Sequence, residues 1–241
     1  MHRPIPAAFA AAAFLLAAGC TPAPRIAPAP ADLDRLYDRA VYEAAVYRPA
    51  HVLPLKPAVA DASGRVRVVT FTSWGGYHPD STLTLTRDVW VTVAPEVQDS
   101  CRTFTGDVAL RINQLLGLPP AAGYDHFAEM WVRAVDLFRP AADPSVTSTR
   151  PCPEGTDTLC GTAFPPGVSP EHVRWIASTM LDHWEVPDGY PWTRLGYTYN
   201  WHPGSPRYGA SEYVVRSGAT VQVASVTSLA EYCAAPSDGA V

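Results

Sequence analysis

Apolar and polar residues alternate along several stretches of this chain, a two-residue period that is typical of strands with one buried face. The alternation is clearest in residues 83–93, where Leu and Val take turns with Thr until Arg87 and Asp88 interrupt it. Trp90 falls on the polar side of this stretch, where we expect it to cover the outer face of a sheet. The other predicted strands are residues 65–73, 127–133 and 194–201, together with residues 212–216 and 220–223 as a hairpin around Ser217 and Gly218.

Other stretches repeat their apolar residues every three or four positions, which indicates helices. The clearest of these helices begins at Ser169 and Pro170, because serine is a favourable N-cap and proline is favoured in the first turn. Its inner face is predicted to include Ile176 and Leu181. The predicted helices are residues 32–47, residues 95–116 ending at Gly117, the stretch from Ser169 to Asp188, and residues 227–233.

This order of strands and helices lacks the regular strand–helix–strand alternation that builds parallel sheets. The sequence therefore predicts an α+β fold, in which a mostly antiparallel sheet packs against three to four helices. Hydrophobic residues make up 47% of the chain, which is enough for a globular core. We expect a single disulfide-stapled domain over residues 32–241.

The chain carries 18 Lys and Arg residues against 23 Asp and Glu residues, for a net charge of −5. Nucleic-acid-binding domains need a basic face, so this balance argues against nucleic acid as a partner. No stretch is apolar over the length of about 20 residues that a transmembrane helix requires. Any attachment to a membrane must therefore involve the N-terminal segment.

The first 20 residues have the pattern of an export signal, with Arg3 near the start, an apolar run over residues 5–16, and small residues before Cys20. The ending Leu-Ala-Ala-Gly-Cys, over residues 16–20, resembles the lipobox of bacterial lipoproteins. This resemblance implies that the chain is cut just before Cys20 and that the Cys20 sulfur carries a diacylglycerol. An ordinary secretory signal, cut before or near Cys20, is the alternative.

The lipobox resemblance also implies a domain order and a location. Residues 1–19 are the predicted signal peptide, and residues 20–31 are a Pro/Ala-rich linker that favours extended polyproline geometry. The mature protein is expected in the cell envelope, anchored to a membrane through Cys20 and facing the periplasm or the exterior. In well-studied lipoproteins an Asp after the lipidated cysteine retains the protein in the inner membrane, so Thr21 favours the outer membrane.

Four cysteines remain besides Cys20, and an even number in an exported chain predicts two disulfides. Three pairings are possible. We favour Cys152–Cys160, because the residues between them make a short closable loop, which leaves Cys101–Cys233 as the second bridge. A four-thiolate metal site is the alternative, but the sequence has no Cys-x-x-Cys pair, and we predict no metal.

The sequence contains no Gly-x-Ser-x-Gly, no His-Glu-x-x-His, no P-loop and no dinucleotide fingerprint, and we predict no cofactor. An imidazole beside a carboxylate can act as a general base or a metal ligand, and two neighbourhoods offer this combination. The first is His126 with Glu129, and the second is His183 and Glu185 with His202 downstream. Surface histidines near acids are common, so a structural role is the alternative for each.

An aromatic stretch is a further candidate for ligand binding. Tyr190, Trp192, Tyr197, Tyr199 and Trp201 lie close together in the sequence, and aromatic faces can stack on the sugar rings of cell-wall glycans. The alternative is that the last three of them form the buried face of a strand.

Together these patterns favour a non-catalytic binding or structural domain that contacts a cell-wall glycan or an envelope protein. An envelope hydrolase that uses one of the His/acid sets, with glycans as its substrates, is the alternative function. Residues 115–120, 136–140 and 190–197 resemble bacterial proteins of unknown activity, and this resemblance implies no site residues.

Overall fold

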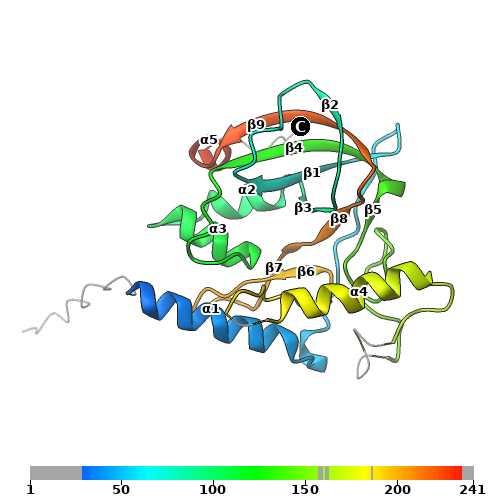
Figure 1. Cartoon of the computed structure of the whole chain (residues 1–241), viewed down its shortest axis with the longest axis horizontal. Coiled ribbons are helices and arrows are strands. Elements are labelled where there is room, and N and C mark those ends of the chain that lie inside the picture. Colours follow the sequence, from blue (N-terminus) through cyan, green and yellow to red (C-terminus); the bar gives the residue numbers. More distant parts are fainter. Residues whose placement is uncertain (1–28, 157–159, 161–162, 186, 235–241) are drawn as a thin grey trace, which may run out of the picture.

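The centre of the fold is a seven-stranded sheet, counted over residues 29–156, 160, 163–185 and 187–234, which the computed structural model describes. Its strand order is β2-β9-β4-β1-β3-β8-β5, and each neighbouring pair is antiparallel (Figure 1). The strands are β1 (Arg65–Thr72), β2 (Thr82–Thr84), β3 (Val89–Val93), β4 (His126–Arg133), β5 (Leu137–Phe138), β8 (Tyr213–Val215) and β9 (Thr220–Ser228).

Both faces of this sheet are buried, so its central strands carry apolar residues on both sides. Val68 and Phe71 of β1 point to opposite faces, because side chains alternate along a strand. Val68 belongs to one hydrophobic core and Phe71 belongs to a second core. The first core includes Val66, Met130, Val132, Val221 and Val223, and the second includes Val97, Ile112, Leu115, Phe127 and Tyr232.

The second core is covered by three short helices, α2 (Glu96–Cys101), α3 (Val108–Leu116) and α5 (Leu229–Ala234). The sequence predicts one helix over residues 95–116, but the chain interrupts it. Gly106 has a φ of 81°, and the Asp107 side chain then caps α3 by accepting a hydrogen bond from the Leu110 N–H at 3.0 Å. Gly117, with a φ of 70°, ends α3 as predicted.

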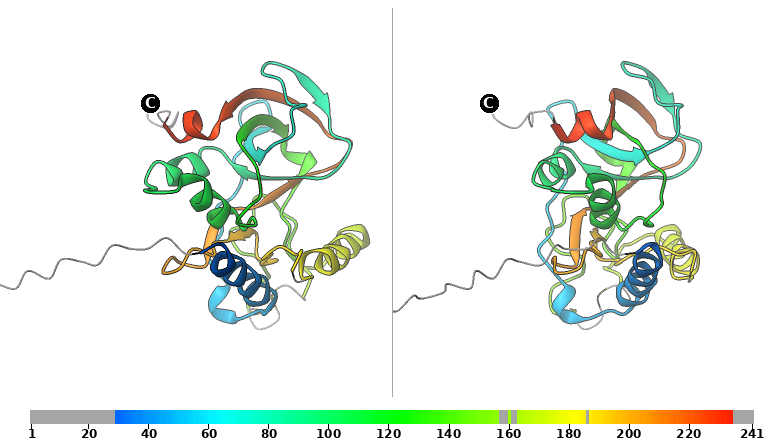
Figure 2. Two further views of the ribbon diagram at one scale, coloured as in Figure 1. Left: turned by 60° about the vertical axis from the view of Figure 1, so that its left-hand side comes forward. Right: turned by 90° about the vertical axis from the view of Figure 1, so that its left-hand side faces the viewer.

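A second layer lies beneath the large sheet in Figures 1 and 2, built from α1 (Pro30–Ala45), α4 (Pro170–His183) and a small sheet of β6 (Tyr197–Tyr199) and β7 (Tyr208–Ser211). Within this layer, α1 packs through Tyr37, whose ring meets that of Trp201 edge to face at 5.7 Å between centroids. The Ser169 hydroxyl caps α4 by accepting a hydrogen bond from the His172 N–H at 3.2 Å, so this predicted helix start is confirmed.

The predicted hairpin and the predicted burial of Leu181 are wrong. No hairpin forms around Ser217 and Gly218, because β8 pairs with β3 and β5 whereas β9 pairs with β4 and β2. The Gly218 N–H instead donates to the Leu85 carbonyl at 2.8 Å, and the chain crosses here from one half of the sheet to the other. Leu181 is 79% exposed, because α4 turns another face inward. The buried residues of α4 are His172, Ile176 and Thr179.

Both predicted disulfides are confirmed. Cys101–Cys233 joins α2 to α5 across 132 residues of sequence, and Cys152–Cys160 closes a short loop. Among the residues described above, no helix is both long enough and apolar enough to cross a membrane. The predicted signal peptide and the lipidation site at Cys20 lie outside the described residues.

Candidate functional site

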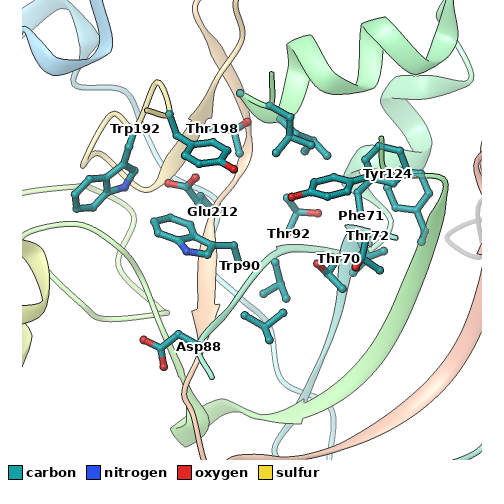
Figure 3. A pocket seen from close by; sticks show the side chains of 18 of the residues that line it. Thr70, Phe71, Thr72, Asp88, Trp90, Thr92, Tyr124, Trp192, Thr198 and Glu212 are labelled. Carbon is teal, nitrogen blue, oxygen red and sulfur yellow. The ribbon is translucent and has the colours of Figure 1, made fainter. Parts of the chain in front are cut away.

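A pocket of about 410 Å³ lies where β3 separates from β1 (Figure 3). The ladder between these strands reaches the pair Val69–Thr92, so residues 70–72 of β1 have β4 on one side and the pocket on the other. Further parts of the wall come from the end of α3, from residues 190–192, from β6 and from Glu212. The pocket therefore lies at the junction of the large sheet with the second layer, and its volume suits a small organic molecule.

The segment after α4 folds back sharply and so places Tyr190 and Trp192 in the pocket wall. The Tyr190 N–H donates to the His183 carbonyl at 2.6 Å, and the Tyr37 hydroxyl donates to the Gly189 carbonyl at 3.0 Å. A Cβ atom at Gly189 would lie 2.4 Å from the His183 carbonyl oxygen. Glycine at this position is therefore part of what shapes the wall.

Aromatic rings line both ends of the pocket. At one end the Trp90 ring lies 6.0 Å from Trp192 and 5.2 Å from His183, measured between centroids. At the other end Tyr124 meets Phe71 edge to face at 5.8 Å (Figure 3). Trp90 therefore lines a cavity, whereas the alternation in the sequence predicts that it covers the outer face of the sheet.

Several polar side chains of the pocket wall are already used by the fold. Asp88 accepts hydrogen bonds from the Trp175 indole N–H and from the Ser217 backbone N–H, each at 2.8 Å. The Thr198 hydroxyl donates to the Leu115 carbonyl at 2.7 Å. These groups hold the walls together and leave little capacity for a ligand.

Glu212 differs from these residues. It is the single residue between β7 and β8, where the chain passes from the small sheet to the large one, and its N–H donates to the Gly196 carbonyl at 3.0 Å. Glu212 is only 9% exposed, and its Oε2 atom has no hydrogen-bond partner among the residues that the structure describes. Burial raises the pKa of Glu212 to about 8, although the charge of Arg139 and the nearby Trp192 indole oppose the increase. At neutral pH the carboxyl group is therefore mostly protonated.

Three more residues of the pocket wall, Trp192, Thr92 and His183, have a buried polar atom without a partner among the described residues; in His183 it is the Nδ1 atom. The Trp192 indole nitrogen lies on the side of its ring nearest Glu212 in Figure 3, but the two groups do not reach hydrogen-bond geometry. The Thr92 hydroxyl oxygen is also buried without a partner. Leaving a buried donor or acceptor unpaired costs about 1–3 kcal/mol, so such atoms are uncommon. Their presence in one cavity marks a place where polar groups of a ligand would be stabilised.

His183 contributes a ring to the aromatic end of the pocket. Its centroid lies 5.5 Å from that of Tyr190 and 5.5 Å from that of Trp192. Burial lowers the pKa of His183, with a smaller opposing effect from the charge of Asp182, so the imidazole is neutral at pH 7. His183 thus gives the pocket a polar ring without a positive charge.

His126 and Glu129, the first predicted His/acid set, do not form one site. They lie three residues apart on β4, so their side chains point to opposite faces of the sheet. The Nδ1 atom of His126 lies 2.6 Å from an oxygen of Asp125, whereas Glu129 forms a partly buried ion pair with Arg67 at 2.5 Å.

The second predicted set is separated as well. His183 lines the pocket, but Glu185 is exposed and does not line it. His202 lies outside the pocket wall, with its Nδ1 atom 3.0 Å from the Ser205 hydroxyl oxygen. The structure therefore brings none of the predicted acids next to His183.

The aromatic stretch is also divided. Tyr197, Tyr199 and Trp201 are 7%, 2% and 1% exposed, so they cannot offer an open stacking surface to a glycan; the alternative of a buried face describes them. Tyr190 and Trp192 do line the pocket, together with part of Tyr199. Each of these three side chains donates a hydrogen bond within the fold. The Tyr197 hydroxyl donates to the His51 carbonyl (2.6 Å), the Tyr199 hydroxyl to the Glu43 carboxylate (2.6 Å), and the Trp201 indole N–H to the Leu118 carbonyl (3.0 Å).

Glu212, Thr92 and Trp90 are not among the site residues predicted from the sequence. The available signal was weak: Glu212 is a lone acid in the otherwise uncharged run of residues 209–215. Because this run leads into an apolar strand, an acidic residue there must either lie at the surface or have its burial compensated by a partner or a proton.

In the described part of the chain, no group of three or more His, Cys, Asp or Glu side chains is arranged to hold a metal ion. The chain matches no protein-family model, no curated protein and no solved structure.

Proposed function

We propose that this protein is a lipid-anchored protein of the bacterial cell envelope, whose folded domain binds a small organic ligand in the pocket around Glu212. The observation that carries the binding function is that Glu212, Trp192, Thr92 and His183, which all line an aromatic cavity of about 410 Å³, each keep a polar atom without a partner among the described residues. Binding sites for small molecules commonly combine apolar walls with a few converging polar groups.

A ligand explains this cavity better than a purely structural role. A structural core is normally filled to high density, and its polar groups are paired. Here the walls are held in place by other hydrogen bonds, such as those of Asp88 and Thr198, while Glu212 and Thr92 keep unused capacity. A bound molecule would supply both the missing contacts and the missing hydrogen bonds.

The same residues favour binding over catalysis. The second carboxylate of the wall, Asp88, is engaged by Trp175 and Ser217, and it lies on the far side of Trp90 from Glu212 in Figure 3. A hydrolase that uses a pair of acids needs both of them on the reacting bond. The geometry therefore gives Glu212 no catalytic partner among the described acids of the wall.

A hydrolase that uses Glu212 alone as a general acid remains the second candidate. One observation favours it: burial raises the pKa of Glu212 to about 8, which keeps a proton available at neutral pH. In this version the neutral ring of His183, which lines the same pocket, would orient the substrate.

The envelope location has support from the chemistry of the cysteines. Disulfides such as Cys101–Cys233 and Cys152–Cys160 persist in oxidising compartments outside the cytoplasm. This agrees with the export signal that the sequence of residues 1–20 predicts.

The proposal is tested by measuring thermal unfolding of the purified chain with a library of amines, acids, sugars and alcohols. A compound that binds only the folded state raises the melting temperature as its concentration increases. We expect one chemical class to do so, and expect Tyr190→Ala, in the pocket wall, to weaken the effect at least tenfold. Tyr208→Ala is the matched control, because Tyr208 is 51% exposed and does not line this pocket.

The same experiment separates the two candidate functions. Each stabilising compound is incubated with the protein and followed by mass spectrometry. Turnover that Glu212→Gln abolishes would favour the hydrolase. Absence of any stabilising compound, or equal stabilisation of the wild type and Tyr190→Ala, would contradict ligand binding in this pocket.

A further inference from the structure

The charge balance around Glu212 indicates which class of ligand the pocket takes. The carboxyl group is buried at one end of the cavity, and its Oε2 atom is an acceptor without a donor. Among the described residues, no Lys, Arg or His forms an ion pair with Glu212. A buried carboxylate of this kind is stable only when something else brings a positive charge or a proton to it.

Arg139 is the residue whose positive charge acts on Glu212, and its donors are used elsewhere. Its Nη1 atom donates to the Gly196 carbonyl at 3.1 Å. Its Nη2 atom donates to the Tyr213 hydroxyl at 2.6 Å and to the Lys56 carbonyl at 2.9 Å. Arg139 therefore influences Glu212 through its charge but donates no hydrogen bond to the Glu212 Oε2 atom.

The walls beside Glu212 suit a cation as well. Trp90 and Trp192 lie beside Glu212 at this end of the pocket in Figure 3, and the negative faces of such rings attract ammonium groups. Phe71 and Tyr124 lie at the opposite end in Figure 3, and Leu116 and Leu118, which also line the pocket, pack in the same hydrophobic core as Phe71. The cavity thus has a carboxyl group among indole rings at one end and an apolar surface at the other.

We propose that the pocket binds a primary or secondary organic amine in its protonated form, with the ammonium N–H groups on Glu212 and the hydrocarbon body toward Phe71 and Tyr124. This inference rests on the proposed binding function and names its ligand class. A hydrogen-bonding ammonium fits better than a quaternary one, because the Glu212 Oε2 atom lacks a donor. The Thr92 hydroxyl and the His183 Nδ1 atom are further polar atoms without a partner among the described residues, and both belong to residues of the same wall.

Binding of an ammonium ion must then release a proton. Glu212 is mostly protonated in the free protein, and only its carboxylate form can pair with the cation. The other charged group at the rim is Arg87, which is exposed, and Asp88 is held by two hydrogen bonds. His183 is neutral because burial lowers its pKa. Tyr77, Tyr190 and Tyr199 line the pocket too, and burial raises the pKa of each, so they stay neutral.

The experiment is calorimetric titration of the purified chain with a panel of primary alkyl- and aralkylammonium ions, each compared with the alcohol of the same skeleton. We expect at least one ammonium ion to bind more than tenfold tighter than its alcohol at pH 8. Its affinity should increase by up to about tenfold per pH unit from pH 6 to pH 8, because one proton leaves on binding. Titration in two buffers of different ionisation enthalpy should show this proton directly.

Glu212→Gln should abolish both the preference for the ammonium ion and the pH dependence. Glu185→Gln, which makes the same change on an exposed residue outside the pocket, should alter neither. If alcohols bind as tightly as their ammonium partners, or if no proton is released, the amine inference is wrong while ligand binding in the pocket stands. If no member of the panel and no compound of the wider library binds, the proposed function fails as well.

Discussion

The carboxyl group of Glu212 and the indole nitrogen of Trp192 lie at the same end of the pocket, but they do not form a hydrogen bond with each other. The two residues come from different layers of the fold, since Glu212 leads into β8 and Trp192 follows α4. Their backbones are fixed by other contacts, such as the bond from the Glu212 N–H to the Gly196 carbonyl at 3.0 Å. The packing of the two layers therefore holds these two polar groups in place without pairing them.

This unpaired carboxyl group predicts a pH dependence of stability. Burial raises the pKa of folded Glu212 to about 8, against 4.5 for an ordinary glutamate. The folded state therefore holds a proton that the unfolded state loses, and stability falls as pH increases from about 4.5 to about 8. The slope from this group is at most about 1.4 kcal/mol per pH unit. Glu212→Gln should remove it.

The measurement is urea unfolding of the wild type and Glu212→Gln at intervals between pH 5 and pH 8. Taking the difference between the two proteins cancels the opposite contribution of His172 and His183, whose pKa values are lowered by burial. The difference should grow with pH in favour of the variant. A constant difference across this range would show that Glu212 ionises normally in the folded protein.

Gly209 predicts a steric limit in the small sheet next to the pocket. A Cβ atom there would lie 2.2 Å from the Leu115 carbonyl oxygen and 2.2 Å from the Thr198 hydroxyl oxygen. Neither neighbour can move freely, because they are hydrogen-bonded to each other at 2.7 Å. Gly209→Ala should therefore cost about 1–3 kcal/mol or more, as overpacking does. Gly75→Ala is the control, since a Cβ at Gly75 meets nothing within 4 Å; equal unfolding midpoints for both variants would contradict the expected clash.

The two disulfides predict a ranking of stability. In the chain-entropy description a cross-link stabilises by restricting the unfolded chain, and more so for a longer loop. Replacing Cys101 and Cys233 by alanine should cost about 5 kcal/mol, against about 2.5 kcal/mol for Cys152 and Cys160. Urea unfolding of the two double variants without reductant measures both losses. A larger loss for the short loop would reverse the ranking and point to native-state contacts of that loop.

The parts of the fold that could be predicted from the sequence depend on neighbouring residues. The helix start at Ser169 follows from a side chain that bonds an N–H three residues on, and the end of α3 follows from the conformational freedom of Gly117. The strand at residues 65–72 follows from local composition, and the Cys152–Cys160 bridge from the shortness of its loop. In each case the physical cause lies within about ten residues of the signal.

The pocket depends on contacts between distant residues. Hydrophobic periodicity indicates that Trp90 and Trp192 prefer to be covered, but it cannot show that they cover each other across 102 residues. Nor can it show that β3 pairs with β1 only from Thr92 onward, so that the residues of β3 before Thr92 border an open space. The hairpin at Ser217 fails for the same reason, because β8 finds its partners in β3 and β5 and not in the next strand. Glu212 becomes informative only when its surroundings are known.

The predicted lipid anchor requires Cys20, and its removal should release the protein from the membrane. A lipoprotein signal places two or three acyl chains on this residue, and two chains are enough for stable anchoring, at about 0.8 kcal/mol for each buried CH₂. We expect the full-length protein expressed in a bacterial host to sediment with membranes and to carry acyl mass on the peptide that begins at Cys20. Cys20→Ser should appear in the soluble fraction, whereas Thr21→Ala should stay with the membranes. A free Cys20 thiol in the native protein, or membrane retention of Cys20→Ser, would replace the lipoprotein interpretation with that of an ordinary secreted protein.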